Sequence, residues 1–208
     1  MTHVAPVIEA MGTVSGSQPY PWPYHGALVP RQTALLACLD PQWRIGRPQD
    51  RESDERLVQL SRTVRSAGGL VVAITATTSH TGRTFLNAGT KIETTVLKDM
   101  EPDVKVKATG TSGFLGSPLD RELRNRKCVD LLVAGWGLEG PVHSTLRAAN
   151  DRGFECLLVA DASTSVDTTL AFAADQMVCF SGGIFGAIAR TSDVLAAYGR
   201  GQTDGSIQ

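Results

Sequence analysis

Residues 130–160 read DLLVAGWGLEGPVHSTLRAANDRGFECLLVA and place two short apolar runs on either side of a helical pattern. The runs at 130–135 and 155–160 are apolar on both faces, which is typical of strands covered by helices on both sides. Between them, residues 141–152 predict a helix with a proline in its first turn and a glycine directly after its last residue. The stretch therefore predicts two buried strands joined by a glycine-rich turn and a helix.

The same alternation of strands and helices extends in both directions along the chain. Further strands are predicted at 33–39 and 70–75, with a weaker one at 177–180, and a short β-like run, DVKVKATG, begins at residue 103. Helices are predicted at 52–67, 117–126, 168–176 and 191–198. This order predicts a three-layer α/β/α sandwich with a mainly parallel, doubly wound sheet.

Composition limits the classes of protein to consider. The 208 residues carry a formal net charge of −1 and no basic run, which gives no support to a nucleic-acid or membrane-surface role. No apolar stretch approaches the roughly 20 residues that span a bilayer, and the N-terminus lacks the features of a signal peptide. We expect an N-terminal arm over 1–30 and one domain over 31–208. We also expect a cytoplasmic location, because the four cysteines lie in or beside apolar runs and suit reduced, buried positions: Cys38, Cys128, Cys156 and Cys179.

In doubly wound sheets, ligands bind beyond the carboxyl ends of the strands. Asp40 occupies such a position after the strand at 33–39, and the turn from Gly135 to Pro141 occupies another. The long connection at 76–103 is predicted to be a lid or an oligomer contact. Lys105 and Lys107 should point in the same direction, so one of them could keep a nearby carboxylate ionised, although a solvated lysine pair would show the same pattern.

The histidines give no metal-binding pattern. No pair has the i, i+4 spacing of helical ligands and no carboxylate cluster accompanies them: His3, His25, His80 and His143. No serine stands at a glycine-flanked apex, which also disfavours a serine-based triad. We therefore expect neither a metal nor a cofactor.

Five segments together resemble one family. They are YPWPYHG at 20–26, Asp40 followed by Gln42, SGFLGSPLDRELRNRKCVDLLVAG at 112–135, VHSTLRAANDRGFECLLVADASTS at 142–165, and SGGIFGAIARTSDVLAA at 181–197. The chain resembles the isochorismatase-like (cysteine hydrolase) family from Tyr20 onward, and within it the ureidoacrylate and biuret hydrolase branch most closely. The resemblance implies an isochorismatase-like fold.

The resemblance also implies a Cys-Asp-Lys triad, and this chain departs from it. Asp40 matches the aspartate, and Lys107 matches the lysine, although its spacing from Phe114 is one residue longer than usual and Lys105 competes with it. The cysteine position falls on Pro141. A proline supplies neither the thiol nor the N–H that would bind an oxyanion, and losing one such donor typically costs about a hundred-fold in rate.

Two functions fit this pattern. In the first, Asp40 acts as a general acid/base with help from Lys107, as in isochorismatases that hydrolyse a vinyl ether without a cysteine. The second is a silenced enzyme that binds a small ligand or a partner subunit on the same scaffold. In both, the expected ligand is a small molecule contacted by Trp43, Trp136, Gly137 and Pro141. The resemblance further implies a homodimer or homotetramer.

Overall fold

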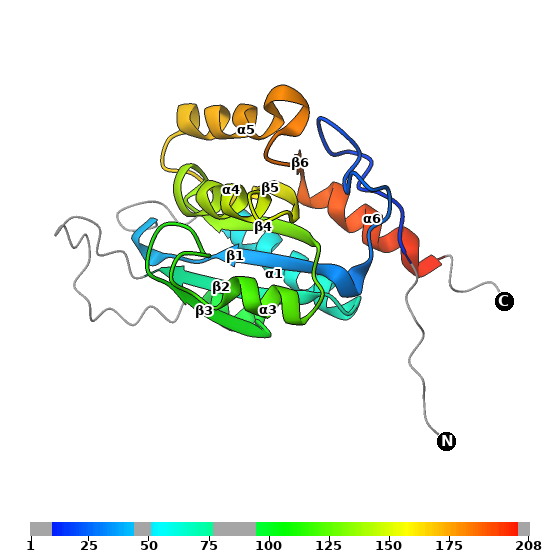
Figure 1. Ribbon diagram of the computed structural model, residues 1–208, viewed down its shortest axis with the longest axis horizontal. Coiled ribbons are helices and arrows are strands. Elements are labelled where there is room, and N and C mark those ends of the chain that lie inside the picture. The colour runs from blue at the N-terminus through cyan, green and yellow to red at the C-terminus, as the bar shows by residue number, and fades with distance from the viewer. Residues whose placement is uncertain (1–9, 44–50, 77–94, 204–208) are drawn as a thin grey trace, which may run out of the picture.

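A six-stranded parallel sheet forms the centre of the molecule (Figure 1). The computed structural model describes residues 10–43, 51–76 and 95–203. The strands lie in the order β3-β2-β1-β4-β5-β6, and all five neighbouring pairs are parallel. Their bounds are β1 Thr33–Cys38, β2 Leu70–Ala76, β3 Val104–Ala108, β4 Asp130–Trp136, β5 Glu155–Thr164 and β6 Ala187–Ala189. The predicted doubly wound α/β/α fold is confirmed.

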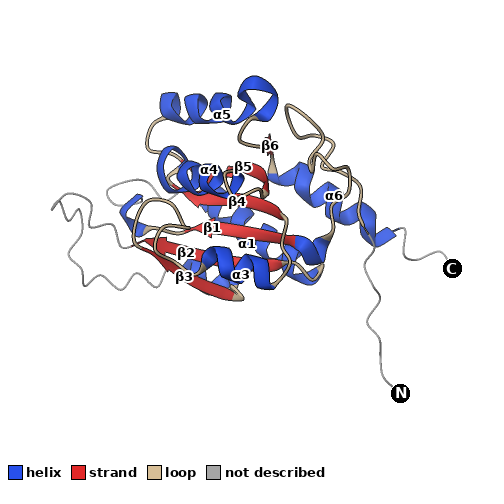
Figure 2. Ribbon diagram, in the orientation of Figure 1, coloured by secondary structure: helices blue, strands red, loops and turns tan. Residues whose placement is uncertain are grey.

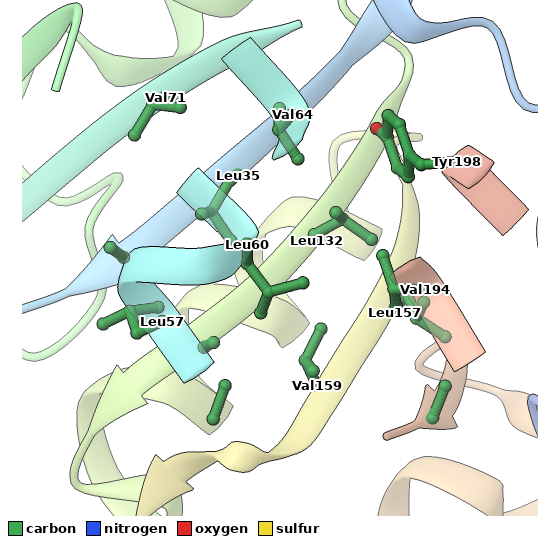
Figure 3. Close-up of a cluster of buried hydrophobic side chains, with 14 of the residues drawn as sticks. Leu35, Leu57, Leu60, Val64, Val71, Leu132, Leu157, Val159, Val194 and Tyr198 are labelled. Atoms are coloured by element: carbon green, nitrogen blue, oxygen red, sulfur yellow. The ribbon is translucent and has the colours of Figure 1, made fainter. Parts of the chain in front are cut away.

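Helices cover both faces of the sheet (Figure 2). One face packs against α1 Arg51–Ser66, α2 Thr95–Met100 and α6 Thr191–Thr203, and the other against α3 Leu119–Asn125, α4 His143–Asn150 and α5 Thr168–Gly183. The predicted helix at 52–67 forms because Leu57, Leu60 and Val64 recur at three-to-four spacing. All three side chains are buried against the sheet (Figure 3). Each face therefore has its own apolar core.

The predicted strand at 177–180 is wrong. Residues Thr168–Gly183 form α5, whose backbone leaves the helical conformation at Phe180–Gly182, and the last strand is Ala187–Ala189. Ala174 and Val178 are buried four residues apart, which is the helical repeat, whereas Met177 and Phe180 lie largely exposed. An apolar run of four residues looks alike in a buried strand and in a helix that is apolar on both sides, so the sequence pattern was ambiguous here. Residues 77–94 of the predicted lid or oligomer contact lie outside the described residues; α2 occupies part of the remainder.

The described part of the N-terminal arm, residues 10–30, packs along the domain. Trp22 and Leu28 are fully buried in the core on the α1 face, and Gln18 pairs in antiparallel fashion with Ile188 of β6. His25 Nε2 lies 2.9 Å from Oδ1 of Asp130, which is buried at the start of β4. The arm therefore contributes to the core, and the boundary between residues 30 and 31 stays a prediction.

Candidate active site

The turn after β4 requires glycine at its first bend. Gly135 has φ +127°, and a Cβ there would lie 2.1 Å from the carbonyl oxygen of Cys38 on the neighbouring strand. Gly137 follows with φ +79°, in the left-handed region that side chains disfavour. These two residues turn the chain sharply at the carboxyl end of β4 and lead it into α4. The elbow, defined here as residues 135–141, is thus fixed by backbone geometry.

Pro141 gives the elbow an unusual helical turn. In an α-helix the carbonyl oxygen of Gly137 would accept from the N–H of residue 141, and proline has none. That oxygen instead accepts from Val142 N at 3.2 Å and from Gly140 N at 3.0 Å. The turn Leu138–Val142 is consequently a π-helix. Position 141 has no N–H to offer to a ligand, as the sequence predicted.

Asp40 lies beyond the end of β1, adjacent to this elbow. Its side chain is 2% exposed, and its carbonyl oxygen accepts from Trp43 N at 3.1 Å in the 3₁₀ turn Pro41–Trp43. The Trp43 indole lies against Gly137 and Gly140, since a Cβ at Gly140 would be 2.3 Å from the ring. The structure therefore brings a buried carboxylate and an aromatic ring to the glycine-rich turn.

Cys38 contacts the elbow from the side of the core and is buried. Its Sγ is 3.7 Å from the carbonyl oxygen of Pro141 and 3.6 Å from Oγ1 of Thr145, and the side chain is 1% exposed. Burial raises the pKa of the Cys38 thiol to about 12. Thr145 Oγ1 also accepts from Gly113 N at 2.9 Å. The sequence analysis did not select Thr145 as a residue of this site. Its position one helical turn after Pro141 was the signal that could have indicated it.

The two candidate lysines lie on the opposite face of the sheet from Cys38. Lys105 and Lys107 are exposed on β3, while Val106 between them packs into the core on the α3 and α4 face. Cys38 belongs to that same core, and Lys107 pairs in register with Thr75 of β2, which separates β3 from β1. The lysines share one direction, as predicted. The assistance of Lys107 to Asp40 stays a prediction.

Trp136 is directed into the core. Its side chain is 2% exposed in the cluster on the α1 face, and its indole N–H donates to Asp54 Oδ1 of α1 at 3.0 Å. Trp136 thus ties β4 to α1, and its role in binding a ligand stays a prediction. Glu139, a residue the sequence analysis did not select, accepts from Val166 N at 2.7 Å and joins the elbow to the segment before α5.

His143, in the first turn of α4, is 9% exposed and its ring lies edge-on to Phe185. Burial, helped by the Arg147 guanidinium, lowers its pKa. Within residues 10–43, 51–76 and 95–203, no group of three or more His, Cys, Asp or Glu residues could hold a metal ion. None of the described helices is long and apolar enough to cross a membrane.

Comparison with known proteins agrees with the fold. Three similar solved structures are a putative isochorismatase from Burkholderia xenovorans (21% identity over 82% of this chain and 88% of that chain, TM-score 0.70), a cysteine hydrolase from Pseudomonas syringae (18%, 83% and 94%, 0.67) and a nicotinamidase from Bacillus subtilis (19%, 76% and 99%, 0.66). The model of the isochorismatase domain matches residues 33–185, which include β1, the elbow and α4. The chain therefore belongs to the isochorismatase family.

Proposed function

We propose that this protein is a hydrolase of small molecules that uses Asp40 as its general acid/base and has no cysteine nucleophile. The observation that carries the proposal is the buried Asp40 carboxyl beside an elbow whose residue 141 is proline. Lys107 assists Asp40 in this proposal, with Lys105 as the alternative, although both side chains are exposed on the face of the sheet opposite Cys38.

The cysteines favour chemistry without a thiolate. Burial raises the pKa of the Cys38 thiol to about 12 and so disfavours the thiolate, which is the reactive form of a cysteine. Burial also raises the pKa of Cys128 to about 11 and the pKa of Cys156 further still. Cys179 lies near the C-terminal end of α5, with its Sγ 3.7 Å from the Gln18 carbonyl oxygen. None of the four is suited to attack a ligand at the elbow.

Pro141 also favours a reaction without an oxyanion. Amide hydrolysis passes through an anion that backbone N–H groups stabilise, and residue 141 cannot donate one. A vinyl ether can react differently: a protonated Asp40 gives its proton to the terminal alkene carbon, and a cation forms at the carbon bonded to the ether oxygen. Water adds to that cation and returns a proton to Asp40, and the resulting hemiketal collapses to a carbonyl compound and an alcohol. The net change is the addition of one water molecule.

A second candidate function is a silenced, ligand-binding protein, and the position of Trp43 favours it. The indole covers Gly137 and Gly140, so the part of the elbow that binds the substrate carbonyl in a thiol mechanism is partly filled. Trp43 would then serve as a flat surface on which a planar ligand stacks.

Asp40→Asn separates these two functions. The substitution keeps the shape of the side chain but removes the transferable proton, so turnover of a panel of vinyl ethers, ureides and amides should fall by about a hundred- to ten-thousand-fold while ligand affinity changes little. Asp151→Asn, at an exposed position after α4, is the matched control and should leave turnover unchanged. Absence of wild-type turnover across the panel, with ligand binding that survives Asp40→Asn, would replace the hydrolase by the binding protein.

A further inference from the structure

The end of α3 and the chain that follows it carry an excess of positive charge. Residues 123–129 contain Arg124, Arg126 and Lys127 and no acidic residue, in a protein whose formal net charge is −1. All three side chains are exposed. Among the described residues, acidic side chains pair with Arg121 and Arg124 of α3 but with neither Arg126 nor Lys127. The helix dipole favours a cation in the last turn of α3, which accounts for Arg124 but not for all three cations.

Two of the guanidinium groups on this surface are held in place. The Arg124 guanidinium carbon lies 4.1 Å from the centre of the Phe154 ring, and its Nη2 donates to the Arg152 carbonyl oxygen at 2.6 Å. The Arg152 guanidinium carbon lies 4.7 Å from the centre of the Phe114 ring, and its Nη1 donates to the Ala148 carbonyl oxygen at 2.6 Å. Each cation–π contact at an exposed site contributes about 0.5–1 kcal/mol. These arginines therefore have less conformational freedom to lose on binding than unsupported surface arginines.

Two exposed apolar side chains border the cations. Val129 is 40% exposed, and Tyr24 of the N-terminal arm is 77% exposed. The Val129 carbonyl oxygen accepts from Glu155 N at 2.9 Å, and Glu155 Oε1 accepts from Tyr24 N at 3.1 Å, so both residues contact the first residue of β5. Arg152 stands three residues before Glu155 and joins the cations to the two apolar side chains. We call this surface, made of Arg124, Arg126, Lys127, Arg152, Val129 and Tyr24, the basic edge.

The basic edge and the elbow lie at opposite ends of β4. The strand begins at Asp130, directly after Val129, and its last residue, Trp136, belongs to the elbow. Its seven residues span about 20 Å, at about 3.3 Å per residue. Figure 1 shows the chain from α3 joining β4 at the end of the sheet where the strands begin. A partner bound to the basic edge therefore leaves the elbow open.

The basic edge has the composition of a protein-binding surface. Arginine and tyrosine, with tryptophan, are the residue types that contribute most of the binding energy in protein interfaces. A guanidinium group binds a carboxylate through two parallel hydrogen bonds, and complementary charge selects the partner. Val129 and Tyr24 add an apolar part that a purely ionic ligand would leave uncovered. The surface therefore fits a segment of protein in which an apolar residue stands among carboxylates.

We propose that the basic edge is a docking site for an acidic segment of a partner protein. Nucleic acid fits less well, because basic runs of about five to eight residues are typical of nucleic-acid sites, and residues 124–127 contain three cations. An anionic membrane also fits less well. A flat anionic surface would meet the Asp120 carboxylate, which lies 3.6 Å from Arg124 Nε, whereas a peptide can pass beside it. This inference does not depend on the hydrolase proposal.

Fluorescence anisotropy of a labelled peptide tests the docking site. The probe is a short peptide in which glutamates flank a single leucine, and the matched probe carries glutamine in place of each glutamate. We expect the full-length wild-type protein to bind the acidic probe about ten-fold more tightly than the glutamine probe at low ionic strength, with a difference that shrinks as salt is added. An acidic probe that binds no more tightly than the glutamine probe would overturn the proposal.

Charge reversal locates the binding. Arg126→Glu combined with Lys127→Glu should weaken binding of the acidic probe by about ten-fold, because each reversal replaces a surface attraction by a repulsion. Arg62→Glu combined with Arg190→Glu is the matched control: it changes the net charge equally at exposed positions on the α1 and α6 face of the sheet, and it should keep the wild-type affinity. Equal weakening in the two double variants would show that only the overall charge attracts the probe, which contradicts a docking site.

Tyr24→Ser tests the apolar part of the basic edge. The side chain is largely exposed, so the substitution should leave the fold intact while the affinity for the acidic probe falls about three-fold or more and its salt dependence stays the same. Unchanged affinity would contradict an apolar residue in the partner. Tighter binding of wild type to oligothymidylate or to phosphatidylserine vesicles than to the acidic probe, lost in Arg126→Glu with Lys127→Glu, would replace the protein partner by a nucleic acid or a membrane.

Discussion

The Cys38 Sγ lies 3.7 Å from the carbonyl oxygen of Pro141, and this contact joins the end of β1 to the elbow. The two residues are 103 positions apart in the sequence, and β1 and β4 pair in register with Cys38 opposite Gly135. The thiol lies on the inner side of the elbow, where it is sealed in by the protein. A cysteine thiol thus lies within a few ångströms of Pro141, but it is buried on the inner side of the elbow.

This burial predicts the order in which the thiols react with iodoacetamide. Cys179 is the one cysteine with partial exposure, whereas Cys38, Cys128 and Cys156 are buried. In native protein we expect Cys179 to be labelled first and the other three only as fast as the protein opens, as measured by mass spectrometry of tryptic peptides. Any turnover should survive labelling of Cys179. Rapid labelling of Cys38, with loss of turnover, would contradict both the burial and the proposed mechanism.

Gly140→Ala tests the contact between Trp43 and the elbow. A Cβ at residue 140 would lie 2.3 Å from the indole, so we expect the free energy of unfolding to fall by about 1–3 kcal/mol, as in other overpacked sites. In a Trp43→Ala background, where the indole is absent, Gly140→Ala should cost less than it does in wild type. Urea unfolding of the four proteins measures this difference as a coupling energy.

The matched control for Gly140→Ala is Gly199→Ala in α6, where a Cβ meets no atom within 4 Å. Alanine is the better helix former by about 1 kcal/mol, so this variant should be as stable as wild type or more stable. Equal losses at residues 140 and 199 would show that the indole does not rest on the elbow.

Several strands and one helix could be predicted from the spacing of apolar residues along the sequence. The strands β1, β2, β4 and β5 were predicted within a few residues because each is a short apolar run, buried on both faces. The helix α1 was predicted because Leu57, Leu60 and Val64 repeat on one side. The resemblance suggests Asp40 as a site residue and Pro141 as the position of a lost cysteine, and both stay predictions. These features depend on local pattern and on matched motifs.

The remaining features depend on contacts between distant segments. The π-helical turn follows from a single missing N–H at Pro141, but the placement of Trp43 over Gly140 needs the turn after β1 to meet the elbow. The direction of Trp136 depends on Asp54 of α1, its hydrogen-bond partner. The strand predicted at 177–180 is wrong because a short apolar run looks the same in a buried strand and in a helix with apolar residues on both sides.

The pH dependence of stability should report on Asp130. Burial raises the pKa of this carboxyl to about 6, partly offset by its hydrogen bond to His25 and the charge of that residue, while its ordinary value is 3.8. At Asp130, the folded protein therefore binds protons more tightly than the unfolded chain between pH 4 and 6. The contribution of Asp130 to stability is present in full below pH 4 and is lost as the pH rises through 6.

Asp130→Asn removes this titration. We expect the difference in unfolding free energy between pH 4.5 and pH 7 to change by about 1–3 kcal/mol relative to wild type, with the variant losing less stability, or gaining more, as the pH rises. Urea unfolding at both pH values measures it, and Asp120→Asn, on the half-exposed surface of α3, is the control. An identical pH profile in wild type and Asp130→Asn would show that this carboxyl ionises in the folded protein as it does in the unfolded chain.

Pro141→Cys asks whether the elbow can still support thiol chemistry. The substitution returns both a thiol and an N–H to the turn, and the N–H can donate to the Gly137 carbonyl oxygen or to a ligand oxyanion. Pro141→Ala returns the N–H alone and is the matched control. We expect Pro141→Cys to be alkylated faster than any native cysteine and to hydrolyse small amides or ureides slowly, at least ten-fold faster than Pro141→Ala. Equal rates for the two variants, with the new thiol freely alkylated, would contradict the hypothesis that a cysteine at residue 141 is what the site needs for amide hydrolysis.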